Sequence, residues 1–170
     1  MTHKRDQAVI AGIACSVALV SLPAFTQGPP LSMEAGLLQQ IAASRTSAHI
    51  EFFAYITMLG KTFVAASLTL SAALLLSFFA RRGKALAFGL LVAVGGATLT
   101  EVILKDLIGR TRPSGALLYE SSFSFPSGHA SVSAALFGFM ALCAWHLIQH
   151  RIYKILLIST LLIIALCIGF

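Results

Sequence analysis

The chain has 170 residues, of which 58% are hydrophobic and 11% are charged. This balance excludes a soluble globular domain of this length and predicts an all-α, polytopic membrane helical bundle, formed as a single domain over residues 1–170. The net charge of +6 does not indicate nucleic-acid binding, because positive charge on a membrane protein usually marks its cytoplasmic loops.

Five apolar runs have, or nearly have, the roughly 20 mostly apolar residues that a helix needs to cross a bilayer. They lie at residues 8–25, 62–80, 85–104, 129–148 and 152–170. The first run has a second interpretation as a signal peptide, because Lys4 and Arg5 precede a short apolar core. Both interpretations of this run stay open.

Residues 31–59, between the first two runs, have a mixed pattern. A proline pair precedes them, and Arg45, His49 and Glu51 interrupt their apolar residues. We expect one or two short helices here, at the surface or at the mouth of the bundle.

Short basic clusters predict the orientation, since Lys and Arg concentrate in cytoplasmic loops. The clusters are Lys4 with Arg5, Arg81 with Arg82 and Lys84, and Arg151 with Lys154. With five spans, all three clusters fall on the cytoplasmic side together with the N-terminus. The loops at 26–61 and 105–128 then face outward.

The outward loop at 105–128 departs from this rule, because it carries Lys105, Arg110 and Arg112. Three cations near the outer membrane surface suit an anion. Phosphate is the natural one, since guanidinium offers forked donors and ammonium a mobile point charge. Glu101 lies four residues before Lys105 on the same helix face, and we expect the two to pair and so position Lys105. The alternative is a solvated loop with stray charges.

Residues 125–131, FPSGHAS, form a second polar feature directly before an apolar run. Ser127 can cap a helix that begins there, although Gly128 and His129 are poor helix formers. A helix N-terminus is a ready anion site, Ser127 can donate to an oxyanion, and His129 can carry a proton near neutral pH. His129 alone has a simpler interpretation as an interfacial histidine. The predicted topology, however, places this stretch on the same side as the basic cluster.

The three cysteines, Cys15, Cys143 and Cys167, lie inside apolar runs. They have neither metal-ligand spacing nor the pattern of a disulfide framework. We therefore predict no metal site, and we interpret these side chains as small buried groups.

The pattern K-x6-R-P that begins at Lys105, followed by P-S-G-H at residues 126–129, resembles the first two signature motifs of a known family. This is the type 2 phosphatidic acid phosphatase and vanadium haloperoxidase superfamily. The stretch from Tyr55 to Gly60 and the R-x-R-P form of the first motif are similar to bacterial membrane members. The resemblance covers residues 45–170.

The resemblance implies a bundle of six spans, five of them present here, in a phosphatase that releases phosphate from lipid phosphates or pyrophosphates without a metal or other cofactor. The residues implied to hold the phosphoryl oxygens are Lys105, Arg112, Ser127 and Gly128. His129 is implied to be the general acid that protonates the leaving group. The implied partners are the lipid phosphate substrate and membrane lipids. The implied location is the bacterial inner membrane, with the site facing the exterior.

The family's third motif, Ser-Arg-x5-His-x3-Asp, supplies a nucleophilic histidine, and no Ser-Arg pair follows His129 in this sequence. We predict that His146 and His150 lie at the cytoplasmic end of the fourth span, where they cannot replace that histidine. The sequence ends about where the third motif would open the sixth span. We therefore expect a chain truncated at its C-terminus, with little or no turnover of its own.

Three functional hypotheses follow. The leading one is a membrane lipid-phosphate phosphatase without its last span. The second is a non-catalytic membrane protein that binds phosphate or an anionic lipid head group with the same residues. The third is a small transporter or channel subunit, although the internal repeats typical of transporters are not found. Phosphate binding separates the first two hypotheses from the third, and turnover separates the first from the second.

Overall fold

The computed structural model describes residues 32–110 and 123–169, and this part of the chain contains six helices and no strand. The predicted all-α class is confirmed. The helices are α2 (Ser32–Ser44), α3 (Ser47–Met58), α4 (Thr62–Phe79), α5 (Gly83–Ile108), α6 (Gly128–Leu147) and α7 (Arg151–Gly169).

Four of the helices in the described ranges, α4 to α7, are long and apolar enough to cross a membrane. They match four of the expected spans, with one clear difference. The third span was expected to end at residue 104, whereas α5 continues to Ile108. Lys105 therefore lies within a helix and not in the loop after it. The expected span at 8–25 lies outside the described residues, so the count of five spans stays a prediction.

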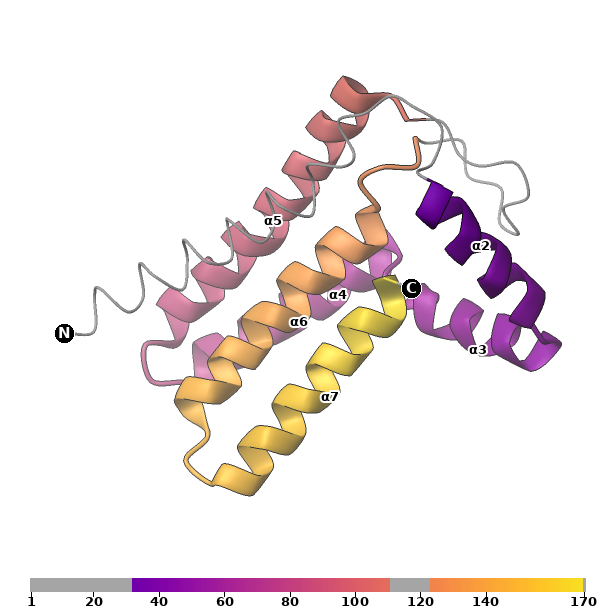
Figure 1. Cartoon of the computed structure of the whole chain (residues 1–170). Helices are drawn as coiled ribbons and strands as arrows, with labels where there is room; N and C mark the ends of the chain where they lie inside the picture. The colour runs from indigo at the N-terminus through magenta and orange to yellow at the C-terminus, as the bar shows by residue number, and fades with distance from the viewer. Residues whose placement is uncertain (1–31, 111–122, 170) are drawn as a thin grey trace.

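The four long helices run antiparallel to their neighbours in sequence (Figure 1). The connections at 80–82 and 148–150 have only three residues each, which forces consecutive helices to pack side by side in opposite directions. Both connections lie at the same end of the bundle, and the first turn of α6 lies at the opposite end. Two of the basic clusters used to predict the orientation, at 81–84 and 151–154, therefore share one end.

The two short helices α2 and α3 account for the mixed segment at 31–59. Thr46 begins α3 as its N-cap, with its hydroxyl accepting a hydrogen bond from the N–H of His49 at 3.3 Å. No residue of α3 is buried, and the helix packs against α7. Figure 1 shows both short helices beside the end of the bundle that holds the first turn of α6. The expectation of one or two short helices, at the surface or at the mouth of the bundle, is confirmed.

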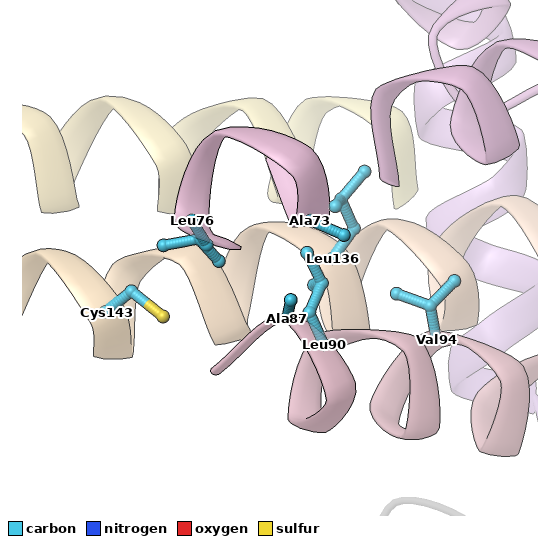
Figure 2. Close-up of a cluster of buried hydrophobic side chains, with 7 residues drawn as sticks. All are labelled: Ala73, Leu76, Ala87, Leu90, Val94, Leu136 and Cys143. Carbon is cyan, nitrogen blue, oxygen red and sulfur yellow. The ribbon is translucent and has the colours of Figure 1, made fainter. Parts of the chain in front are cut away.

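The packed core lies between α4, α5 and α6. Its members are Ala73, Leu76, Ala87, Leu90, Val94, Leu136 and Cys143 (Figure 2). The small side chains among them let the helix backbones approach closely, which is how helices associate in a membrane, where lipid is as apolar as the core. Large apolar residues such as Phe78 and Phe79 are instead highly exposed. Their exposure suits an outer surface that contacts lipid.

We expect Leu90→Ala to lower the free energy of unfolding by about 2–5 kcal/mol, because Leu90 is fully buried and its removal leaves a cavity among three helices. Leu91→Ala is the matched control. Leu91 is the next residue and is 43% exposed, so the same truncation should cost about 0.5 kcal/mol or less. Denaturation in mixed detergent micelles measures both values. Equal losses would show that the core is not where the structure places it.

Candidate functional site

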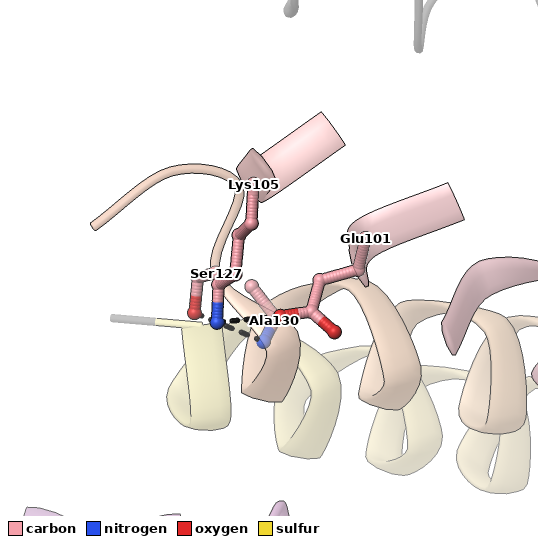
Figure 3. Close-up of polar contacts among 4 residues, drawn as sticks. All are labelled: Glu101, Lys105, Ser127 and Ala130. Carbon is pink, nitrogen blue, oxygen red and sulfur yellow. Dashed lines mark hydrogen bonds and ion pairs between the residues drawn. The ribbon is translucent and has the colours of Figure 1, made fainter. Parts of the chain in front are cut away.

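The first turn of α6 is capped by Ser127, as its sequence predicts. Ser127 has extended backbone angles, and its hydroxyl accepts a hydrogen bond from the N–H of Ala130 at 3.4 Å (Figure 3). The carbonyl of Ser127 accepts the first helical bond, from the N–H of Ser131 at 2.9 Å. Gly128 and His129 thus occupy the first turn, where backbone N–H groups have no partner inside the helix and attract anions.

Ser133, in the next turn of α6, fixes the backbone of this first turn. Its side chain is buried, and its hydroxyl donates to the carbonyl of His129 at 2.6 Å and to that of Ala130 at 3.2 Å. A hydroxyl buried in an apolar bundle needs such a partner. The bond therefore satisfies Ser133 and also ties the position of His129 to the second turn of the helix.

Near its C-terminal end, α5 contributes an ion pair. The ammonium of Lys105 lies 2.5 Å from Oε1 of Glu101, and the two side chains are only 16% and 11% exposed. The predicted pairing of these residues is confirmed. It forms because α5 continues past residue 104, so that an i, i+4 spacing places both side chains on one face. Gly109 then ends the helix in the left-handed conformation, at φ +60°, with its N–H bonded to the carbonyl of Lys105.

The ion pair lies against the first turn of α6. A Cβ added to Gly128 would stand 2.9 Å from Oε1 of Glu101, the same oxygen that contacts Lys105. The missing side chain of Gly128 therefore lets the acid, and with it Lys105, approach the helix N-terminus. Figure 3 shows the ion pair and the capped turn together. The two sequence motifs, which begin 21 residues apart, meet at this point.

Two hydrogen bonds close the segment that joins the motifs. The carbonyl of Arg110 accepts from the N–H of Ser124 at 2.8 Å and from the hydroxyl of Ser124 at 3.1 Å. The aromatic ring of Phe123 also lies 3.9 Å from the position of a Cβ on Gly109. The chain thus returns at residue 124 to the place it left at residue 110. Arg112, a predicted phosphate ligand, lies outside the described residues.

The side chain of His129 faces the junction between α3 and α4. A Cβ on Gly60 would lie 2.8 Å from Cδ2 of the imidazole and 3.1 Å from its Cβ. His146 follows His129 by 17 residues in the same helix, which separates them by about 26 Å. His150 lies further on, in the connection before α7. Both histidines are therefore at the opposite end of the bundle, as predicted.

Sequence reasoning missed three residues that shape this site, namely Gly60, Ser124 and Ser133. Gly60 lies in a stretch that carried the family resemblance, but nothing local marks it as a neighbour of His129. The described residues contain no group of three His, Cys, Asp or Glu side chains placed to hold a metal ion. Within the same residues, Cys143 and Cys167 are thiols that form no disulfide.

A family model described as the PAP2 superfamily matches residues 85–170. The match covers α5 from its third residue, α6 and α7, and the residues between them, and it therefore includes both motifs of the site. The chain belongs to the PAP2 superfamily. The family resemblance of the motifs is thereby confirmed, and the chain is a membrane protein of the PAP2 phosphatase type.

Both the sequence and the structural comparison find PAP2 proteins of Bacillus subtilis. Phosphatidylglycerophosphatase B of strain 168 is 40% identical over 62 residues, which cover 36% of this chain and 29% of that protein. The matched stretch thus spans less than a third of the relative's length. A crystal structure described as the first transmembrane PAP2 type phosphatidylglycerolphosphate phosphatase aligns with a TM-score of 0.74 and 24% identity. It covers 91% of this chain and 79% of that one. This likeness shows a shared transmembrane fold.

We expect Glu101→Gln to tighten the binding of inorganic phosphate to the detergent-solubilised protein. The amide keeps a hydrogen-bond acceptor for Lys105 but removes the negative charge that a bound anion must face. Isothermal titration calorimetry measures the change.

Asp106→Asn is the matched control for that variant. It is also a change from acid to amide, next to Lys105 on the same helix, but Asp106 is exposed. Phosphate affinity should stay the same in this variant, because solvent screens an exposed charge. An equal effect of both variants, or none from Glu101→Gln, would contradict a specific role for Glu101.

Proposed function

We propose that this PAP2 domain binds the phosphate group of a membrane lipid phosphate or pyrophosphate and serves its hydrolysis. The observation that carries the proposal is the contact between the two motifs. The Glu101–Lys105 pair lies against Gly128. A cation from α5 is therefore close to the N-terminus of α6. A cation and a helix N-terminus that converge in this way favour a phosphate over a neutral ligand.

The phosphate would be held by groups of three kinds. Lys105 supplies an ammonium charge, and the first-turn N–H groups at Gly128 supply donors that point along the helix axis. Ser127 accepts a bond from Ala130 through its hydroxyl oxygen, which leaves the hydroxyl hydrogen to donate to a phosphoryl oxygen. Arg112 is assigned to the same task by the family motif, as a forked donor.

His129 follows these groups in the same turn, and we assign it the role of general acid. Cleavage of a phosphate ester leaves an alkoxide, and cleavage of a pyrophosphate leaves a phosphate; either leaves more readily when it takes up a proton. The imidazolium of His129 would donate that proton to the leaving oxygen. Phosphoryl transfer otherwise asks mainly for positioning and charge stabilisation, which the surrounding cations provide.

No residue of the printed sequence is assigned as the nucleophile. The family's nucleophilic histidine belongs to a Ser-Arg motif that does not follow His129 here. His146 lies about 26 Å from His129 along α6 and cannot attack the same phosphorus. We therefore expect this chain to bind phosphate with little or no turnover. The alternative function is therefore non-catalytic binding of phosphate or of an anionic lipid.

We infer an orientation with the site on the outer face of a bacterial inner membrane. The basic turns at 81–84 and 151–154 lie at the end of the bundle opposite His129, and such clusters favour the cytoplasm. The name of the Bacillus relative, phosphatidylglycerophosphatase B, makes phosphatidylglycerol phosphate the first lipid to test. Its head group ends in a phosphate monoester, which suits a site built for a terminal phosphate.

We expect Lys105→Ala to weaken the binding of inorganic phosphate roughly tenfold or more, because a charge-assisted hydrogen bond contributes about 1.5–3 kcal/mol. Lys84→Ala is the control. It removes the same side chain from the opposite end of the bundle, where Lys84 is exposed, and should leave phosphate binding unchanged. Titration calorimetry in detergent measures both variants. Equal affinities for the wild type and Lys105→Ala would contradict the proposed site.

We expect no release of phosphate above background from short-chain phosphatidylglycerol phosphate. A colorimetric phosphate assay on the purified chain measures this, with His129→Ala as the reference. Release that is abolished in His129→Ala would show that the chain is a working phosphatase and would overturn the expected lack of turnover. Binding without release would favour the non-catalytic alternative for this chain.

A further inference from the structure

Gly60, at the junction of α3 and α4, is buried where three parts of the bundle meet. A Cβ at this position would lie 2.7 Å from Cγ2 of Ile168, near the end of α7, and 2.8 Å from Cδ2 of His129. Carbon atoms in contact are normally about 3.5–4.0 Å apart. No residue larger than glycine fits here unless the imidazole or Ile168 moves.

The requirement for glycine here is steric and does not come from backbone conformation. Among the described glycines, Gly109 has a positive φ and Gly60 does not. The N–H of Gly60 donates to the carbonyl of Thr57 at 2.9 Å, and the N–H of Ala65 donates to the carbonyl of Lys61 at 2.8 Å. These bonds fix the backbone on both sides of Gly60. Another residue could adopt the same backbone angles but not the same space.

The backbone around His129 and its ring are held by different neighbours. The carbonyl of His129 is fixed by the hydroxyl of Ser133, and the preceding Gly128 lies against Glu101. These contacts hold the backbone of the turn. The ring itself meets Gly60 through Cδ2, the carbon bonded to the Nε2 nitrogen. Because the ring is rigid, any shift of Cδ2 carries Nε2 with it.

We propose that Gly60 is a positioning residue for His129: its missing side chain admits the imidazole and sets where Nε2 lies relative to the bound phosphate. This inference rests on the proposed function. Proton transfer requires the donor and acceptor atoms to be about 2.6–3.2 Å apart. A displacement of about 1 Å can cost two orders of magnitude in rate. A methyl group at residue 60 is therefore expected to displace the acid without altering the phosphate ligands on α5.

The test compares Gly60→Ala with Gly138→Ala. Gly138 lies in α6, the helix that carries His129, and a Cβ there would meet nothing within 4 Å. The first readout is the ring signal of His129 in a 1H–13C NMR spectrum of ligand-free protein with labelled histidine, assigned through His129→Asn. We expect the signal to shift in Gly60→Ala and to stay in place in Gly138→Ala. If the ring signal of Gly60→Ala stays at the wild-type position, as that of Gly138→Ala should, the inference is overturned, and this result does not depend on phosphate affinity.

The second readout is a double-mutant cycle on phosphate affinity with Gly60→Ala and His129→Asn. The imidazolium that protonates the leaving oxygen also donates a hydrogen bond to an oxygen of bound inorganic phosphate, so we expect each change alone to weaken phosphate binding about threefold or more. In the His129→Asn background, Gly60→Ala should have no further effect, because it acts through the ring that is no longer present. A general packing role for Gly60, exerted through Ile168, would instead make the two effects additive and would overturn the proposal.

Two further proteins, the double variant Gly60→Ala with Ile168→Ala and the single variant Lys105→Ala, resolve the outcomes that Gly60→Ala alone leaves open. If Gly60→Ala does not fold, Gly60→Ala with Ile168→Ala removes the contact at 2.7 Å but keeps the one to His129, so the ring should still move. A second outcome is that the ring moves but His129→Asn leaves phosphate affinity unchanged. His129 then does not contact the bound phosphate, and Gly60 has no role in positioning it there. Lys105→Ala then shows separately whether a phosphate site exists. The failure of this inference and that of the proposed function are thus distinguished.

Discussion

The ion pair between Glu101 and Lys105 is the interaction through which the two halves of the site meet. Both side chains are largely buried, and a buried charge without its partner is strongly destabilising. The pair is therefore kept together, and Gly128 gives it room beside the N-terminus of α6. A carboxylate is also favoured there by the helix dipole. Glu101 thus lies where the field of the protein favours negative charge, and in the proposed function a bound phosphate would share that field.

The first turn of α6 is fixed by its neighbours more than by its own helix propensity. Gly128 and His129 are poor helix formers, yet the helix begins with them, and each contacts a residue from another part of the bundle. On one side Gly128 admits Glu101 of α5, and on the other His129 fits against Gly60. The cap at Ser127 and the hydroxyl of Ser133 complete the turn. Both glycines therefore contribute space, which side chains from other parts of the bundle occupy.

Much of this arrangement could be predicted from sequence because it depends on local signals. Hydropathy predicted four of the spans, the capping residue at Ser127 marked the start of α6, and the i, i+4 spacing predicted the Glu101–Lys105 pair. The end of α5 was placed too early, since the prediction followed apolarity, whereas the helix continues through charged residues until Gly109 ends it. The contact between Gly60 and His129 joins residues 69 positions apart, and no local pattern encodes such a distance.

The end of α7 shows why the packing of the bundle and the geometry of the site cannot be separated. Ile168 is buried against Gly60, and a Cβ on Gly169 would lie 3.5 Å from Cβ of Ala130, in the first turn of α6. The last turn of α7 is thus an apolar wall beside Gly60 and the first turn of α6. A change that alters the tilt of α7 would move this wall and the imidazole together, because interiors packed this tightly transmit small displacements. Apolar residues of α7 therefore help to determine where the imidazole of His129 lies.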